Sequence, residues 1–359
     1  MTNILINYQK LHETTRDLFV AIGCSRTDAI LIADVLIAAE LRGIPSHGIA
    51  RIIDYMAMYE ARRINIQPKP KVVHETPSTA TIDGDNAFGM IPGYMAMNLA
   101  IEKAKTCGSG WVSVNNSNHY GIAGFYAMMA LKNNMIGISS TNANPLVAPT
   151  FSVSRFLGTN PLAVAIPAGK YPPFVADFAT TPIARGKLAM MEKKGLKAPA
   201  GFVQDKKGYS SDDPAILKDG GAILPLGGDY EHGSHKGYCM GALVDIFSSV
   251  IGGANFGPFV PPQIPYLPIP ENQPGKGLGH FFGAFRIDAF RPASDFTRDM
   301  EKWIETFKQA KPAEGHSEVF IPGEPELRNE NKYSVEGIPV LDKTWSSIQE
   351  IAVKLKLEI

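Results

Sequence analysis

The first 60 residues carry apolar side chains at the spacing of helices. Leu18, Phe19 and Ile22 belong to one amphipathic stretch, and residues 30–38 belong to a second. After a break in the pattern, a third helix is predicted over about residues 47–61. The chain is therefore expected to begin with a helical region that ends near residue 70.

From about residue 71 the apolar positions alternate, which is the period of β-strands. Strands are predicted over residues 71–76, 78–85, 110–117, 135–142, 156–167, 172–180 and 277–290. Helical spacing returns between and after them, and helices are predicted over residues 92–105, 122–132, 185–194, 237–250, 294–310 and 341–359. Residues 196–208 are expected to form a loop, and the proline-rich residues 258–275 an excursion from the core. This alternation predicts an α/β fold, with a sheet flanked by helices.

The chain has 359 residues, which is enough for about two domains. Lysine plus arginine and aspartate plus glutamate both number 35, so the formal net charge is zero. A balanced chain has no long-range field that would attract DNA, RNA or an anionic membrane. We therefore expect no nucleic-acid partner and no membrane partner, and the composition favours chemistry on a small molecule.

Three cysteines, Cys24, Cys107 and Cys239, lie far apart in the sequence. They form no pair with the spacing of a zinc site or of a disulfide framework. The first residues lack the basic start and long apolar stretch of a signal peptide. The longest apolar stretches are interrupted by Asp34 and Asp245, short of the roughly 20 residues that span a bilayer. These features predict a cytoplasmic protein, and the histidine spacings predict no metal site.

The common nucleotide-binding and hydrolase motifs do not occur in the sequence. No GxGxxG follows a predicted strand, and the nearest string, from Gly277 to Gly283, has the wrong spacing. GxxxxGK[ST], HExxH and GxSxG are also missing. These motifs therefore assign no particular chemistry to the chain.

One segment brings three chemically distinct side chains to one face of a predicted helix. His47, Arg51 and Tyr55 are four residues apart, so in a continuous helix they project from the same side. Arginine can bind a carboxylate through two parallel hydrogen bonds, and histidine can transfer a proton near neutral pH. The segment therefore favours a site for a small hydroxy acid or oxo acid. A solvated helix face that carries a histidine is the alternative.

Polar residues also gather where predicted strands end. His119 lies in the string NNSNHYG after an apolar strand, Asn142 ends another strand, and Thr159 and Asn160 lie in a third segment of this kind. Sheets of α/β proteins bind ligands at strand ends, so we expect Thr159 and Asn160 to contact the substrate and Asn142 to contact a cofactor. Asparagine is also an ordinary turn former, and capping loops would explain the same strings.

Two further strings indicate an acid and an anion site. Asp177 interrupts an apolar, strand-like run, and a buried carboxyl group needs a partner. It would either orient a catalytic histidine or cap a neighbouring helix. Lys236 and Gly237 open a glycine-bearing helix, whose free amide groups and lysine would attract an anion. An ordinary flexible turn is the alternative for this second string.

Seven strings occur in a fixed order along nearly the whole chain: SHGIAR, NSNHYG, GTNP, ADFATT, ARGK, GSHKG and GHFF. Together they resemble the type-2 malate/L-lactate dehydrogenase family, whose relatives include L-sulfolactate, ureidoglycolate and diketogulonate dehydrogenases and cyclic imino-acid reductases. The resemblance implies an enzyme that binds NAD or NADP without the usual glycine fingerprint. It also implies a homodimer, with a non-classical nucleotide-binding sheet domain and a separate, mostly helical lobe.

The resemblance also implies roles for individual residues. His47 matches an acid/base histidine with Ser46 beside it, and His119 matches a second histidine that carries the proton in some members. Arg51 and Tyr55 match positions that contact the substrate. On this basis His47 is expected to be the principal general acid and base.

Further matches concern the cofactor and a supporting acid. Asp177 matches an acid that works with a Ser–His pair in imino-acid reductases. Matches to nucleotide-contacting segments cover Val175, Asp177, Phe178, Ala179, Thr180, Thr181, Lys236, Gly237, Gly323 and Glu324. The glycine-rich segment that precedes GTNP in the family reads FSVSRFL here, so contacts from residues 152–157 stay open.

These matches predict a helical lobe made by residues 1–70 with about 294–359, and a nucleotide-binding sheet domain over residues 71–293. The expected reaction is hydride transfer between NAD(P) and a small 2-hydroxy acid, with malate and oxaloacetate as the preferred pair. Reduction of a cyclic imino acid or of another oxo acid is the alternative, and a non-catalytic small-molecule binding protein is a distant one. NAD and NADP are not distinguished, because the ribose-contacting residue has no recognisable motif.

Overall fold

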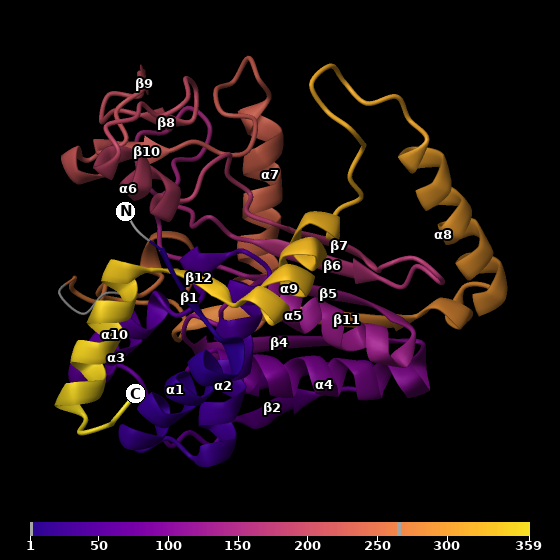
Figure 1. Cartoon of the computed structure of the whole chain (residues 1–359), viewed down its shortest axis with the longest axis horizontal. Helices are drawn as coiled ribbons and strands as arrows, with labels where there is room; N and C mark the ends of the chain where they lie inside the picture. The colour runs from indigo at the N-terminus through magenta and orange to yellow at the C-terminus, as the bar shows by residue number, and fades with distance from the viewer. Residues whose placement is uncertain (1–2, 264–266) are drawn as a thin grey trace.

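The computed structural model describes residues 3–263 and 267–359. The predicted excursion over residues 258–275 therefore lies partly outside the described residues. A seven-stranded mixed sheet forms the centre of the molecule, with strands in the order β2–β3–β4–β11–β5–β6–β7 (Figure 1). The bounds are β2 (Lys71–Glu75), β3 (Thr79–Asp83), β4 (Ser109–Ser117), β5 (Met135–Thr141), β6 (Leu162–Ile166), β7 (Phe174–Phe178) and β11 (Leu278–Arg286). All seven predicted strands are present, and the one that comes last in sequence lies at the middle of the sheet.

The strand directions bring the predicted polar strand ends to one edge of the sheet. β3 and β4 pair in parallel, and the other neighbouring strands described in this sheet pair antiparallel. It follows that β3, β4, β5 and β7 all point the same way. His119 follows β4, Asn142 follows β5 and Thr180 follows β7, so all three lie toward this common edge.

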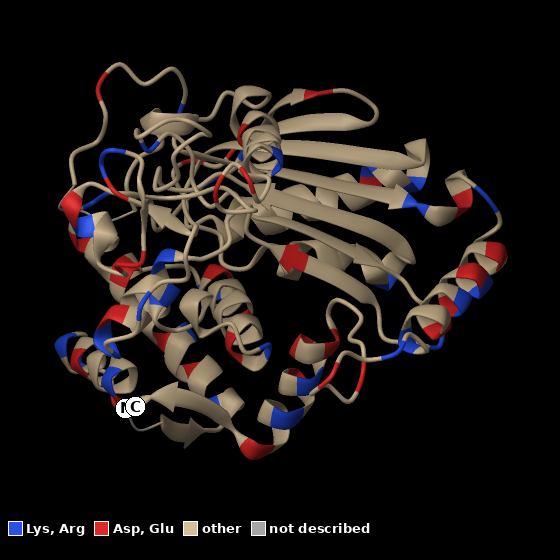
Figure 2. Ribbon diagram, turned by 90° about the horizontal axis from the view of Figure 1, so that it is seen from above, with Lys and Arg blue, Asp and Glu red and all other residues tan. Residues whose placement is uncertain are grey.

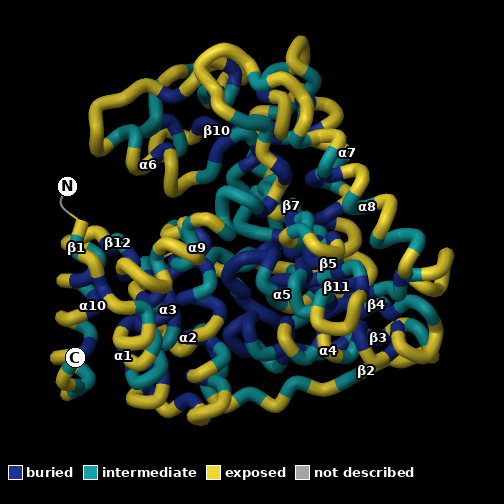
Figure 3. Tube along the Cα trace, turned by 45° about the vertical axis from the view of Figure 1, so that its right-hand side comes forward, coloured by how far each residue is buried: buried dark blue, intermediate teal, exposed yellow. Residues whose placement is uncertain are grey.

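Helices cover both faces of the sheet. One face packs against α4 (Met90–Cys107) and α5 (Ala123–Met129), and the other against α7 (Ser234–Asp245), which continues into the π-helical turn η4 (Ile246–Val250). The buried parts of the chain concentrate in the sheet and in the helices packed on it (Figure 3). A Cβ atom on Gly137 would lie 2.0 Å from the Ala127 carbonyl oxygen, so this glycine lets α5 approach β5 closely. Within the described residues, no helix is both long and apolar enough to cross a bilayer.

A second layer of helices is formed by segments from both ends of the chain. It contains α1 (Tyr8–Ala21), α2 (Arg26–Leu41), α3 (Arg51–Glu60), α9 (Glu324–Glu336) and α10 (Asp342–Lys354). Strand β1 (Asn3–Ile6) pairs antiparallel with β12 (Ile338–Leu341), and both share a core with the first three helices. The sequence pattern missed β1 and β12 because four residues show too little alternation. It missed α9 because that helix has no fully buried residue and thus no apolar stripe.

Helix α8 (Ala293–Lys308) lies apart from the other chain-end helices (Figure 1). Its residue Ile304 packs with Ala168 and Ile321 beside the β6–β7 hairpin, and Glu305 accepts a hydrogen bond from Lys170 at 2.9 Å. The sequence analysis grouped α8 with the helical lobe, but these contacts join it to the edge of the sheet. An amphipathic pattern shows that a helix buries one face without showing against what.

A small layer between residues 143 and 233 has a core of its own. It contains α6 (Arg185–Lys193) and the short strands β8 (Val203–Gln204), β9 (Ser210–Ser211) and β10 (Ala222–Ile223). Its core includes Val147, Leu157, Leu188 and Val203. The predicted loop over 196–208 therefore contains β8, whose two residues are too few for a sequence pattern. Five short helical turns complete the described elements: η1 (Pro45–His47), η2 (Ala130–Asn133), η3 (Ile216–Asp219), η5 (Gly257–Phe259) and η6 (Ile287–Ala289).

The charges of the described residues are distributed without a single-sign face. Basic and acidic residues are interspersed over the helices and loops of the ribbon, and α8 carries both along its length (Figure 2). Many form local ion pairs, such as Arg291 with Asp299 at 2.8 Å. Opposite charges therefore lie close together over the described surface, in addition to cancelling over the whole sequence.

A buried histidine lies in the middle of the sheet. His280 on β11 has no exposed surface, and its two ring nitrogens lie 2.7 Å from the hydroxyl groups of Ser117 and Thr141. Its ring stacks on Tyr120, with centroids 4.6 Å apart. Burial lowers the pKa of His280 to about 3, so the ring is neutral in the folded protein.

We expect the substitution His280→Phe to lower the free energy of unfolding by about 2–4 kcal/mol, because two buried hydroxyl groups lose a partner while the ring stack is kept. Urea unfolding followed by circular dichroism measures this, and His74→Phe on the exposed strand β2 is the control. The contribution of a histidine with a lowered folded-state pKa is complete above about pH 6.5 and is lost as the pH falls below it. Equal unfolding midpoints for His280→Phe and the wild type would contradict the prediction.

Candidate active site

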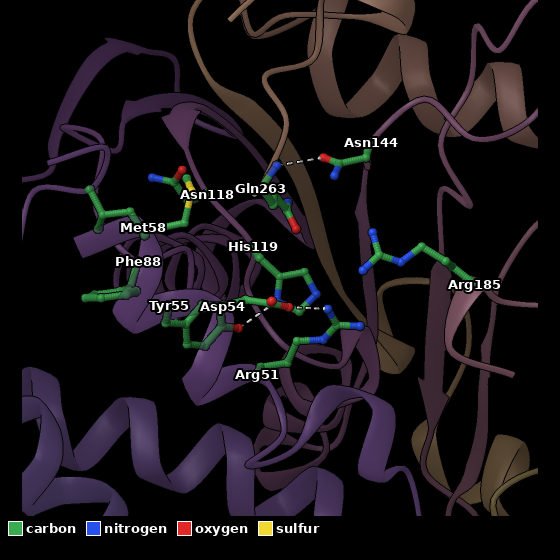
Figure 4. A pocket seen from close by; sticks show the side chains of 11 residues that line it. Arg51, Asp54, Tyr55, Met58, Phe88, Asn118, His119, Asn144, Arg185 and Gln263 are labelled. Carbon is green, nitrogen blue, oxygen red and sulfur yellow. Dashed lines mark hydrogen bonds and ion pairs between the residues drawn. The ribbon is translucent and has the colours of Figure 1, made fainter. Parts of the chain in front are cut away.

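A pocket lies between α3, the end of β4 and the start of α6 (Figure 4). Its polar lining consists of Arg51, Asp54, Tyr55, Asn118, His119, Asn144, Arg185 and Gln263. Its apolar lining consists of Met58, Ile64 and Phe88. Three of the predicted site residues, Arg51, Tyr55 and His119, therefore line one pocket, although they come from two distant parts of the sequence.

The predicted continuous helix through His47, Arg51 and Tyr55 is wrong at its start. His47 belongs to the short turn η1, and α3 begins only at Arg51. Gly48 is extended, and a Cβ atom there would lie 2.1 Å from a carboxylate oxygen of the buried Glu40. The same Glu40 oxygen accepts a hydrogen bond from the Ile49 N–H at 2.8 Å. The contact with Glu40 stabilises a non-helical backbone at Gly48. His47 and Arg51 therefore do not belong to one continuous helix.

Glu40 is therefore a buried support of the turn that carries His47. It is 4% exposed, and burial raises the pKa of its carboxyl group to about 7, although the Ile49 N–H favours the charged form. The sequence analysis did not select Glu40, because an acid inside an apolar helix gives no sign of what it faces.

The two predicted histidines lie against each other. The rings of His47 and His119 stack with centroids 5.4 Å apart. His47 Nδ1 lies 2.9 Å from the Ser46 hydroxyl, and His119 Nδ1 lies 2.7 Å from the Tyr55 hydroxyl. A longer contact of 3.3 Å joins the Gly121 N–H to His119 Nδ1. Each histidine thus has one nitrogen fixed by a hydroxyl group, and His119 is the one that lines the pocket.

Both histidines are neutral at neutral pH. Burial, with the nearby Arg51 cation, lowers the pKa of His47 to about 4. The pKa of His119 is lowered well below its usual value, first by burial and then by Arg51, His47 and His280. Burial also raises the pKa of Tyr55, so its hydroxyl keeps its proton. A neutral imidazole beside a neutral phenol can accept a proton from a bound hydroxyl group.

Arg51 is held by its own segment. Its Nε donates to the Ser46 carbonyl oxygen at 2.7 Å, and Nη1 donates to Asp54 at 2.9 Å. The second terminal nitrogen, Nη2, has no hydrogen-bond partner among residues 3–263 and 267–359. The guanidinium group thus has a fixed orientation, and it ties the turn of His47 to α3.

Of the polar lining residues that the sequence analysis did not select, three come from outside α3 and the end of β4. Arg185 opens α6, Asn144 follows β5, and Gln263 lies in the proline-rich segment. The Gln263 N–H donates to the Asn144 side-chain oxygen at 3.3 Å. Arg185 belongs to the string ARGK that the sequence analysis noted, but nothing in that string shows which cavity its side chain enters.

Comparison with known proteins identifies the family. The model of the malate/L-lactate dehydrogenase family matches residues 6–349. The chain belongs to this family. A malate dehydrogenase of Pyrococcus abyssi is 41% identical over 332 residues, which are 92% of this chain and 89% of that protein. An L-sulfolactate dehydrogenase of Methanocaldococcus jannaschii is 38% identical, over 96% of this chain and 95% of that protein. The crystal structure of malate dehydrogenase from Entamoeba histolytica superposes with a TM-score of 0.92 at 32% identity, covering 100% of this chain and 99% of that one.

Two residues that were predicted to contact ligands are instead buried in the family fold. Asn160 has no exposed surface, and its amide binds the Ala143 N–H and the Gly241 carbonyl oxygen. Asn142 is 1% exposed, and its amide binds Gly279 and Asn255. Their side-chain amides join loops to one another.

Thr159 and the threonines after β7 are joined through the backbone. The Thr159 carbonyl oxygen accepts hydrogen bonds from the Thr180 N–H at 2.9 Å and from its hydroxyl at 3.1 Å. The Thr181 hydroxyl donates to the Ile183 carbonyl oxygen at 3.0 Å. Thr180 and Thr181 are both buried, and their hydroxyl groups already form hydrogen bonds. A cofactor contact from these residues would therefore have to use their backbone atoms.

The other predicted cofactor residues line the outer edge of β7. The Val175 N–H donates to the Pro322 carbonyl oxygen at 3.0 Å, which brings Gly323 against Val175. The Asp177 side chain is exposed, and its carboxylate accepts a hydrogen bond from the Gly124 N–H at 2.7 Å. Asp177 thus lies at the start of α5, where it caps that helix. Phe178 and Ala179, the next residues, are partly exposed along the same edge.

The Glu324 carboxylate forms hydrogen bonds within the protein. It accepts hydrogen bonds from Lys308 and from the Ile321 N–H, both at 2.9 Å. These contacts join the start of α9 to α8. Glu324 therefore has a structural explanation, and Gly323 is the part of the pair that faces β7.

The start of α7 lies close to the end of β7. A Cβ atom on Gly237 would lie 2.1 Å from the Leu226 carbonyl oxygen, and the Leu226 N–H donates to the Thr180 carbonyl oxygen at 2.9 Å. The absence of a side chain at Gly237 therefore lets the helix start reach the sheet edge. Lys236 is exposed there, beside the positive end of the helix dipole.

Proposed function

We propose that this protein is an NAD- or NADP-dependent 2-hydroxy-acid dehydrogenase of the cytoplasm that interconverts malate and oxaloacetate. The observation that carries the proposal is the pocket in which the pinned imidazole of His119 lies beside the fixed guanidinium of Arg51. A base and a carboxylate-binding cation are the two groups that oxidation of a 2-hydroxy acid requires. The named activities of its relatives in the family support this choice of substrate.

His119 is the residue that we assign to proton transfer. In the oxidation direction its Nε2 takes the proton of the substrate hydroxyl group while hydride leaves the neighbouring carbon. For Nε2 to be free, the ring proton must reside on Nδ1 and be donated to the Tyr55 oxygen at 2.7 Å. The longer contact of 3.3 Å, in which the Gly121 N–H donates to Nδ1, is then lost. Arg51 Nη2 binds the substrate carboxylate and fixes the distance between hydroxyl group and base.

The residues at the sheet edge fit a nicotinamide dinucleotide. Lys236 and the amide groups at the start of α7 suit its phosphates, and the close approach at Gly237 brings them beside β7. The partly exposed edge from Ala176 to Ala179, beside the contact of Gly323 with Val175, would hold the rest of the molecule. When bound, the nicotinamide supplies the acceptor for the hydride.

The formation of reduced nicotinamide, followed by its near-ultraviolet absorbance, tests the proposal. Malate, lactate and sulfolactate are each offered with NAD and with NADP, and EDTA is present throughout. Oxidation of malate that survives EDTA is the expected result. No turnover of any 2-hydroxy acid with either cofactor would overturn the proposal.

The lowered pKa of His119 predicts the pH dependence of the reaction. A base with a pKa below 6.5 stays unprotonated to lower pH than an ordinary histidine. We therefore expect kcat/KM for malate oxidation to stay constant as the pH falls from 8 to about 6, and to decline only below that. The profile of kcat/KM reports groups of the free enzyme. A decline centred near pH 7 or above would contradict the prediction.

We also propose that the protein is a homodimer. Leu243, Ile246, Phe247, Val250 and Ile251 form an exposed apolar stripe along the outer side of α7 and η4. A run of exposed apolar residues of this length on a globular protein is typical of an interface. A second copy of the chain is the natural occupant, because most oligomers of this kind have two-fold symmetry.

Light scattering should give twice the mass of one chain at micromolar concentration. The substitution Val250→Glu, which places a charge on the apolar stripe, should shift the mass toward that of a single chain. Val335→Glu on α9, which is exposed outside the stripe, is the matched control. A wild-type protein of monomer mass with full activity would contradict the dimer.

A further inference from the structure

Two guanidinium groups from unrelated elements enter the pocket. Arg51 comes from α3 and Arg185 from the start of α6, and Figure 4 shows Arg185 reaching in from the side opposite to Arg51. Gly186, the next residue, lies beside Ser46, since a Cβ atom on Gly186 would be 3.7 Å from the Ser46 Cβ. The start of α6 is therefore positioned next to the turn that carries His47.

The two arginines differ in what surrounds them. Arg51 is balanced by Asp54 and anchored to a carbonyl oxygen. The guanidinium group of Arg185 has no hydrogen bond or ion pair with any residue in 3–263 or 267–359. It thus brings to the pocket a positive charge that no described residue neutralises, together with N–H donors that are not used within the described part of the chain.

Other donors lie on the same side as Arg185. Gln263 lines the pocket, and its Nε2 atom is buried without a hydrogen-bond partner among the described residues. Asn144 lies beside it. An unpaired buried donor is unfavourable unless a ligand supplies the acceptor. The acceptor that would satisfy Arg185 and Gln263 together is an anionic oxygen.

We propose that Arg185 selects substrates with a second acidic group, so that the preferred ligand is a small 2-hydroxy or 2-oxo acid with a carboxylate or sulfonate on its third carbon. This inference rests on the proposed function of the same pocket. Arg51 binds the carboxylate next to the reacting carbon, and Arg185 binds the distal anion. The distal group thereby orients the carbon chain between His119 and the apolar residues Met58, Ile64 and Phe88.

The ratio of kcat/KM for malate to kcat/KM for lactate measures this role, because lactate lacks the distal anion. Arg185→Gln is expected to lower the ratio about 10- to 100-fold, the value of one charge-assisted hydrogen-bonded contact. Arg185→Lys, which keeps the charge but not the planar fork, should retain part of the preference. Lys187→Gln, an exposed residue two positions along α6, is the matched control and should leave the ratio unchanged.

Sulfolactate separates the two distal anions. A fall for malate and sulfolactate alike assigns Arg185 to any second anion, whereas a fall for one alone narrows the selected group to that anion. An equal loss with malate and lactate, or a rise confined to the KM of the cofactor, would overturn the inference while the proposed function stands. Absence of hydroxy-acid oxidation by the wild-type protein would instead defeat the proposed function. The thermal midpoint of Arg185→Gln should match the wild type, since the exposed side chain contacts no described partner.

Discussion

Replacing His119 by alanine is expected to lower kcat for malate oxidation by about 10²- to 10⁴-fold, which is the typical contribution of a general base. His119 is the histidine that lines the pocket, and Tyr55 fixes its Nδ1. The loss should fall on kcat, with the KM of the cofactor nearly unchanged, because the predicted cofactor segments lie along β7 and α7. Steady-state kinetics with malate as the varied substrate provides the measurement.

Two variants decide how the proton is handled. His47→Ala should cost less than His119→Ala, because His47 stacks behind His119 and is not part of the pocket lining. Tyr55→Phe keeps the ring but removes the hydroxyl group, so it should lower kcat moderately and leave His119 in place. If His47→Ala proved to be the more damaging change, the proton would belong to His47, as the sequence alone predicts.

Arg51→Lys is expected to raise the KM for malate about 10- to 100-fold and to leave the cofactor KM unchanged. Lysine provides a point charge, whereas Arg51 uses Nε and Nη1 to fix itself and presents Nη2 to the ligand. The variant also loses the contact with the Ser46 carbonyl oxygen, so a smaller decrease in kcat should accompany the effect on KM.

Asp54→Asn separates these two roles of Arg51. It removes the charge that balances the guanidinium group while the contact with Ser46 is kept. We expect a smaller change in KM than for Arg51→Lys. If Arg51→Lys weakened only the binding of the cofactor, Arg51 would belong to the nucleotide site instead.

Helical spacing in the sequence selected residues that the structure places at or beside the pocket, although the continuous helix that it implied is not formed. Helical periodicity selected His47, Arg51 and Tyr55, yet the helix begins at Arg51, because Glu40 and Gly48 shape the preceding turn. The spacing of residues in a sequence predicts only local backbone structure. The contact with Glu40 is a tertiary contact, so the spacing could not predict the break in the helix. His119 was selected because polar residues at a strand end are typical of ligand sites, and the structure places its side chain in the lining of the pocket.

Other residues were beyond sequence reasoning for physical reasons. Asn142 and Asn160 have the residue type of ligand contacts, but burial commits their amides to loop carbonyl and amide groups. Arg185 opens a helix that was predicted, but a helical pattern does not show which cavity the side chain enters, and only the packing of α6 beside Ser46 brings Arg185 into the pocket. The seven-stranded sheet was predicted well because alternation persists over several residues in each strand.

The pairing of β1 with β12 has a consequence for the order in which the site can form. Asn3 lies opposite Leu341, so residues at the two ends of the described chain share one ladder and one core. During synthesis α3, which carries Arg51 and Tyr55, leaves the ribosome long before its packing partners in β12 and α10. The part of this core that β12 and α10 supply is therefore available only after about 280 further residues have been added. The helical core that supports Arg51 and Tyr55 is thus complete only after β12 and α10 have been made.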